Sequence, residues 1–181
     1  MPARLPRPQG RKVAVLMAYD VSITRLPLFT LFDLKGGADA LRAWCGPALP
    51  ALPARPTRAL TAAGRTVVWT GPDHWLMRAD LAEEAALYTA LRPDDAPGDI
   101  SIVQVSDTLV FFAITGPDAG DVMAVATPLD LHPDLFPPDA ASWSEAFGTK
   151  ALIRPIADGF ELAVDRSYAD WVEAMLGRTA S

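Results

Sequence analysis

The sequence lacks most of the residues and motifs on which enzymes build a reaction centre. Among its 181 residues are one cysteine and two histidines, which excludes a disulfide within these residues and a metal site of three histidines. It has no G-x-G-x-x-G, no G-x-x-x-x-G-K-[ST] and no G-x-S-x-G motif. These absences argue against a dinucleotide cradle, a triphosphate-binding loop and a serine-hydrolase nucleophile.

Long apolar runs are also missing. No run of 18 apolar residues occurs, so we expect no membrane-spanning helix. The longest early apolar stretch, residues 13–18, is too short for the core of a signal peptide. Cys45 ends an apolar helical pattern, which is typical of a small core residue rather than a nucleophile. A single cysteine fits a reducing compartment, so the expected location is cytoplasmic.

Positive charge is scarce in the second half of the chain. Residues 1–90 hold 11 Lys/Arg and 7 Asp/Glu, whereas residues 91–181 hold 5 and 15, for a net charge of −6. An acidic protein of this kind is a poor candidate for nucleic-acid binding through a broad basic face. The acidic half is interpreted either as a solvated surface or as a docking face.

One short pattern resembles a set of metal ligands. Asp130, His132 and Asp134 alternate as ligands on a strand would. Prolines at 128, 133, 137 and 138 surround them, and proline both fixes its own φ and lacks an N–H for a sheet. We therefore predict a rigid loop rather than a metal site.

The chain divides into a basic tail, residues 1–19, expected to be partly disordered, and one unit over residues 20–181. Within that unit the order strand, helix, proline-rich connection, hairpin, strand and helix occurs twice, in residues 20–97 and 98–177. This matched order is the main evidence for a repeat, and three pairings support it: Gly37 with Gly116, Gly64 with Gly148, and Trp75 with Phe160. Hairpins followed by helices predict an α+β fold of two similar β-α-β halves, with mainly antiparallel sheets around a pseudo-twofold axis.

Three elements are predicted in enough detail to be compared with a structure. Residues 22–34 form one strand-like run, although periodicity alone does not exclude a helix there. A helix beginning at Asp80 is expected to bury Leu81, Ala85, Tyr88 and Leu91. The last helix, from Ser167 to Gly177, is expected to bury Tyr168, Trp171, Val172 and Met175.

Five motifs in order resemble the gamma-subunit family of heterotetrameric sarcosine oxidase, over about residues 20–176. They are Gly46-Pro-Ala-Leu-Pro50, Trp69-Thr-Gly-Pro-Asp-His-Trp-Leu76, Ile114-Thr-Gly-Pro-Asp-Ala119, Pro128-Leu-Asp-Leu-His132 continuing to Phe136-Pro-Pro138, and the segment from Gly159 to Asp170. The resemblance implies a fold similar to the folate-binding domain of the glycine-cleavage aminomethyltransferase.

The same resemblance implies a non-catalytic subunit of a flavin-dependent enzyme. Such an enzyme demethylates sarcosine oxidatively to glycine and can pass the one-carbon unit to tetrahydrofolate. FAD, FMN, NAD and tetrahydrofolate are then expected in the partners, the alpha, beta and delta subunits. No catalytic, cofactor or metal residue is expected in this chain, and the gamma subunit would act through assembly.

Candidate interface residues are Leu135, Phe136, Pro137 and Trp143. A proline-framed loop usually lies at the surface, and aromatic side chains commonly anchor interfaces. Trp69 and Trp75 lie on predicted strands and are interpreted as core residues.

A second hypothesis is a stand-alone folate-binding or one-carbon-transfer protein on the same fold. It would need a slot for the pteridine with a few placed polar groups. Asp73, Asp107 and Asp118 are the available acids, although Asp118 is expected in the first turn of a helix, where its charge favours the dipole.

Overall fold

The computed structural model describes residues 18–181, so most of the expected basic tail lies outside the described residues. These residues form two five-stranded sheets in which every pairing is antiparallel. The first sheet has the order β3 (Ala59–Ala62), β4 (Arg65–Gly71), β5 (His74–Asp80), β2 (Phe29–Gly36), β6 (Ile100–Gln104). The second has the order β1 (Ser22–Arg25), β7 (Leu109–Thr115), β10 (Gly159–Asp165), β9 (Thr149–Ile156), β8 (Ser142–Ala146).

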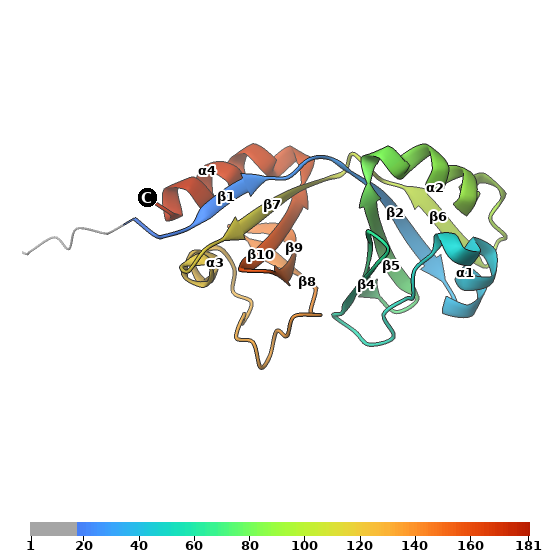
Figure 1. The fold of residues 1–181 in the computed structure, drawn as a ribbon, viewed down its shortest axis with the longest axis horizontal. Coiled ribbons are helices and arrows are strands. Elements are labelled where there is room, and N and C mark those ends of the chain that lie inside the picture. The colour runs from blue at the N-terminus through green and yellow to red at the C-terminus, as the bar shows by residue number, and fades with distance from the viewer. Residues whose placement is uncertain (1–17) are drawn as a thin grey trace, which may run out of the picture.

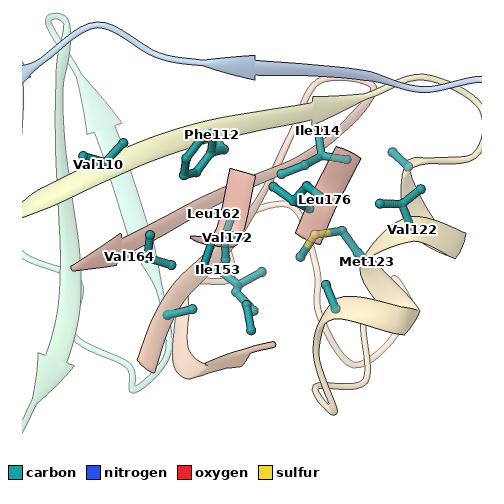
Figure 2. Close-up of a cluster of buried hydrophobic side chains, with 14 of the residues drawn as sticks. Val110, Phe112, Ile114, Val122, Met123, Ile153, Leu162, Val164, Val172 and Leu176 are labelled. Carbon is teal, nitrogen blue, oxygen red and sulfur yellow. The ribbon is translucent and has the colours of Figure 1, made fainter. Parts of the chain in front are cut away.

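Four helices cover the outer faces of the two sheets in the described chain. Helices α1 (Ala38–Cys45) and α2 (Glu84–Leu91) pack on the first sheet, and α3 (Ala119–Ala126) and α4 (Ala169–Thr179) pack on the second. Figure 2 shows the second of these cores, where Phe112, Ile153 and Leu162 of the sheet meet side chains of α3 and α4. The predicted α+β fold with antiparallel sheets is confirmed.

The inner faces of the sheets contact each other. Strand side chains alternate between faces, so β2 sends Phe32 and Leu34 to the helices and Leu31 to the opposite sheet. Leu31 joins a third apolar cluster that draws Leu76 from the first sheet and Phe111 and Leu152 from the second. The architecture is therefore helices, sheet, sheet, helices.

The two halves exchange their first strands. Strand β1 precedes β2 in the chain but pairs with β7, whereas β6 precedes β7 but pairs with β2. Figure 1 shows β1 lying along β7 in the half opposite to β2. Because of this exchange, neither sheet is complete without a strand from the other half.

The exchange corrects the prediction of one strand over residues 22–34. The chain leaves β1 at Arg25, crosses between the sheets through Leu26-Pro27-Leu28, and begins β2 at Phe29. Proline lacks the N–H that a continuous ladder needs, so Pro27 suits the crossing. Both segments are strand-like, so the sequence alone did not show the break between them.

A glycine lies beside the start of each exchanged strand, where the strand joins its sheet. Gly36 and Gly116 have φ of +120° and +122°, and a Cβ on either would lie 2.6 Å from a backbone oxygen, of Asp99 and Asp20 respectively. Both conditions favour glycine. In the structural repeat Gly116 is therefore equivalent to Gly36. The prediction paired it with Gly37, which is one residue away.

The buried faces of two helices differ from the predictions. Asp80 and Asp165 each accept a hydrogen bond from the backbone two residues later and begin a single 3₁₀ turn, Leu81–Glu83 and Arg166–Tyr168, before the α-helix. A 3₁₀ turn has a different angular step, so the face that follows is rotated. In α2 the buried residues are Leu87 and Leu91, whereas Leu81, in the turn before the helix, is exposed. In α4 they are Ala169, Val172 and Leu176, with Tyr168 and Trp171 exposed.

Candidate functional site

One end of the layer between the sheets is closed by a buried ionic network. Glu161 on β10 accepts hydrogen bonds from Arg154 on β9, with Nε to Oε1 at 2.7 Å and Nη2 to Oε2 at 3.3 Å. Arg78 on β5 of the other sheet places Nη1 2.7 Å from the same Oε1 as an ion pair, although its N–H direction does not satisfy hydrogen-bond geometry. The carboxylate therefore joins the two sheets.

Two aromatic rings complete this network. The Arg78 guanidinium lies 4.3 Å from the ring centre of Phe29 and 5.0 Å from that of Phe111. The two rings meet edge to face at 5.2 Å. Cations are attracted to ring faces, most strongly where water is excluded, so the rings partly compensate the second positive charge.

The electrostatics of the network match a structural role. Burial alone would raise the pKa of Glu161, but the hydrogen bond from Arg154 and the charges of Arg78 and Arg154 outweigh it and hold the pKa below its ordinary value. Burial lowers the pKa of Arg78, and the charge of Glu161 opposes that shift. The adjoining cavity measures about 10 Å³, space for at most one water, so no substrate fits beside these charges.

The other end of the same layer is open. A cleft of about 380 Å³ is lined from both halves by Asp33 on β2, Thr70 on β4, His74 on β5, Trp143 on β8 and Lys150 on β9. Because these residues come from strands far apart in the sequence, only the packing of sheet on sheet brings them together.

The polar side chains of the open cleft form two pairs. His74 Nε2 lies 2.5 Å from Asp33 Oδ1, and Lys35 Nζ lies 3.3 Å from the other carboxylate oxygen. Lys150 Nζ lies 4.4 Å from the ring centre of Trp143, as a cation over an aromatic face. The hydroxyl of Thr70 is buried without a hydrogen-bond partner among the described residues. The cleft can thus offer a ligand an imidazole and an ammonium.

The three acids considered for a folate site do not converge. Asp73 lies in the turn between β4 and β5 with φ of +50°, and Asp107 lies between β6 and β7. The carboxylate of Asp118 accepts a hydrogen bond from the backbone N–H of Asp20 at 2.7 Å, at the start of α3. None of the three lines the open cleft, whose acid is Asp33. The alternating pattern of β2 gave no sign that this carboxylate would face the other half.

The candidate interface residues lie in different environments. Leu135 is 68% exposed, but Phe136 is only 6% exposed and belongs to the core under α3 and α4. Pro137 and Trp143 are half-buried. Phe136 therefore differs from the prediction, because its backbone N–H bonds the carbonyl of His132 and the tight turn directs the ring inward.

The cysteine and the two tryptophans that were interpreted as core residues lie in or against the core. Cys45 is buried, and burial raises the pKa of its thiol to about 11 although the charge of Arg92 opposes this. Trp75 is buried, with its indole N–H donating to the carbonyl of Pro53, and Trp69 is half-buried against the same core.

The alternating Asp-His-Asp pattern forms a loop, as predicted. Asp130 accepts a hydrogen bond from the backbone N–H of His132, and His132 Nδ1 accepts one from that of Asp134. In residues 18–181 no cluster of three His, Cys, Asp or Glu side chains suits a metal ion. Over the same range no helix is long and apolar enough to cross a membrane.

Comparison with known proteins relates this chain to a known family. Residues 40–181 match the model of the sarcosine oxidase gamma subunit family. A curated relative, the sarcosine oxidase subunit gamma of Corynebacterium sp. (strain P-1), is 32% identical over 102 residues, which is 56% of this chain and 48% of that protein. The match thus spans about half the length of the relative.

Two solved structures share the fold. A chain of the heterotetrameric sarcosine oxidase of Corynebacterium sp. U-96 superposes with a TM-score of 0.71 at 23% identity, over 89% of this chain and 86% of that one. The glycine cleavage system aminomethyltransferase T of Bartonella henselae superposes with a TM-score of 0.64 at 17% identity, over 88% of this chain and 46% of that one. With the family match across most of its length, this chain belongs to the sarcosine oxidase gamma subunit family.

Proposed function

We propose that this protein acts as the gamma subunit of a heterotetrameric sarcosine oxidase, through assembly with larger subunits rather than through catalysis of its own. The observation that carries the proposal is the family match over residues 40–181. The superposition of nearly the whole chain on a chain of a heterotetrameric sarcosine oxidase supports it.

In this proposal the complex demethylates sarcosine oxidatively to glycine and delivers the one-carbon unit to tetrahydrofolate. The alpha, beta and delta subunits hold FAD, FMN, NAD and tetrahydrofolate, and the complex works in the cytoplasm. This chain supplies a folded surface against which larger subunits are held.

The connection between α3 and β8 supplies part of that surface. Leu135 is exposed at its tip, while Phe136 is buried beside it and fixes the loop to the core. An exposed leucine on a loop anchored in this way is positioned for a partner at little cost in conformational entropy. Pro137 and Trp143 flank the same connection and complete the proposed contact.

The test is a tagged pull-down of this chain from its native cells, followed by an absorption spectrum and a peroxide assay with sarcosine. We expect larger co-purified chains, flavin bands and sarcosine-dependent peroxide. Leu135→Asp should reduce the recovered flavin, and Leu28→Asp, at an exposed leucine between β1 and β2, is the control. A colourless chain recovered alone would contradict the proposal.

A second candidate, a stand-alone folate-binding protein, is favoured by one observation. The open cleft between the sheets presents His74, Trp143 and Lys150, on a fold shared with aminomethyltransferase T. Isothermal titration of the isolated chain with tetrahydrofolate separates the two candidates. Micromolar binding that is lost in Lys150→Ala would favour the second candidate, whereas no heat of binding would leave assembly as the function.

A further inference from the structure

An open acidic groove runs along α3 on the outer side of the second sheet. It joins two hollows, of about 710 Å³ and 520 Å³, that share Gly120 and Phe160. The first hollow lies between the start of α3 and the ends of β1, β7 and β10, and the second lies between α3 and the loop that follows it. In Figure 1 this loop extends below the sheet, and its end at residues 139–141 is hydrogen-bonded to residues 57–59 of the first half.

The floor of the groove is apolar, and the residues of α3 that line it have small side chains or none. Pro128, Leu129, Leu131 and Phe160 supply the apolar surface. On α3, Gly120 and Ala124 lie one turn apart on the groove side. A Cβ on Gly120 would meet nothing within 4 Å. A polypeptide segment can therefore approach the helix closely here.

The charge of the groove has one sign. Asp20, Asp130 and Asp158 line it, and no lysine or arginine does. Within residues 18–181 no lysine or arginine forms an ion pair with any of these three carboxylates. Helix α3 and the loop after it belong to a stretch without positive charge, since positions 93–149 hold ten Asp/Glu and no Lys or Arg.

A second cleft lies at the other end of β1 and β7 and differs from the groove in charge. It measures about 520 Å³, is lined by Leu26, Leu28 and Phe111, and carries Arg25 and Arg166, of which Arg25 is paired with Asp170 and Glu173. The groove along α3, in contrast, presents carboxylates that have no Lys or Arg partner among residues 18–181, and complementary potentials favour a basic partner there.

We propose that the groove along α3 binds a basic amphipathic segment of a larger partner subunit, with apolar side chains on its floor and Lys/Arg against Asp20, Asp130 and Asp158. The proposal rests on the proposed function for the identity of the partner. An extended, solvent-open groove suits a polypeptide segment better than a small molecule, which binding sites usually enclose.

The first experiment measures the affinity of this chain for the remaining subunits of the complex. Ala124→Lys places a long cationic side chain on the groove, and Ala174→Lys makes the same change at an exposed alanine of α4. We expect Ala124→Lys to weaken binding about tenfold or more, and Ala174→Lys to stay within about twofold of the wild type. Equal affinities for the two variants would overturn the proposal, and circular dichroism checks that both fold.

The second measurement isolates the charge. Asp130→Asn keeps the oxygen that accepts from His132, and Asp158→Asn keeps a side chain that tolerates φ of +62°. The double variant should bind more weakly at low salt and show a shallower dependence on ionic strength, because two attractive charges are lost. Asp95→Asn with Asp99→Asn, at exposed positions just before β6 of the first sheet, is the control and should leave the salt dependence unchanged.

A peptide probe separates failure of the groove from failure of the proposed function. If the wild-type chain binds no other subunit, the proposed function fails, and the groove is then tested with a labelled peptide of alternating leucine and lysine. Binding to the wild type but not to Ala124→Lys, and no binding of the leucine–glutamate peptide, would support the groove. Equal binding of the two peptides, or binding of neither, would overturn it.

Discussion

The two ends of the layer between the sheets have the same strand framework but opposite packing. At one end Arg78, Arg154 and Glu161 close around each other and leave about 10 Å³. At the other end His74 and Lys150 border a cleft of about 380 Å³. The closed end holds two interlocked halves together, and the open end contributes little to that task.

The comparison shows that polar residues in a protein centre need not form a reaction site. The closed network is buried, its one carboxylate is shared by two guanidinium groups from the two sheets, and it has no room for a ligand. Residues available to other molecules lie instead in the open cleft and along the outer face of α3.

Removing the shared carboxylate should have the largest effect. Glu161→Ala leaves two guanidinium groups buried without their anion, and breaking a buried pair in this way costs about 3–5 kcal/mol. Urea denaturation measures the loss. Glu145→Ala, at an exposed position on the neighbouring β8, should change stability by less than about 0.5 kcal/mol. Similar losses in the two variants would contradict the role of the network.

Disturbing the strand exchange should come next. Gly116→Ala introduces a Cβ 2.6 Å from the carbonyl oxygen of Asp20 at φ of +122°, which should cost about 1–3 kcal/mol. Gly120→Ala is the matched change four residues later, in a helix with open space around it. It should be neutral or stabilising by about 1 kcal/mol. If both glycines tolerated alanine equally, the entry of β1 would not constrain the fold.

Acid should weaken the closed end. The pKa of Glu161 is lower in the folded chain than its ordinary value, so its contribution is full above the unfolded pKa and is lost as pH falls toward the folded value. The wild type should therefore lose more stability than Glu161→Gln between neutral pH and about pH 3. Parallel pH profiles in urea titrations would show that the carboxylate adds no such stability.

The smallest effect is expected at the open end. Lys150→Met keeps the apolar stem but removes the charge over Trp143, a contact worth about 0.5–1 kcal/mol at an exposed site. Thermal unfolding should shift by a few degrees at most. A loss as large as that of Glu161→Ala would mean that both ends of the layer hold the halves together.

The sequence predicted individual turns better than it predicted which strands pair with each other. The turns at Gly64 and Gly148 were correct because each glycine takes a positive φ, of +77° and +78°, at a hairpin. The exchange of β1 and β6 was not predicted, since the local sequence of a strand does not show which sheet the strand joins. The predicted buried positions at Leu81 and Trp171 were wrong because a capped 3₁₀ turn begins each segment and changes which residues face the core.

The candidate sites were less predictable still. Arg78, Arg154 and Glu161 lie on three strands in two sheets, so their convergence depends on how the sheets pack. Phe136 was expected at the surface because its loop is rich in proline, yet a hydrogen bond to His132 turns it into the core. A charged residue inside an apolar strand, such as Arg78, is the one signal that marked the buried network.

The most direct test of the central claim, that this chain works by assembly, is to mix it with the purified remaining subunits and measure mass and flavin absorbance together by size-exclusion chromatography with light scattering. The account predicts that the chain moves into one larger species that carries the flavin absorbance. Elution of the chain at its own mass of 19.4 kDa, apart from the flavin-bearing peak, would contradict it.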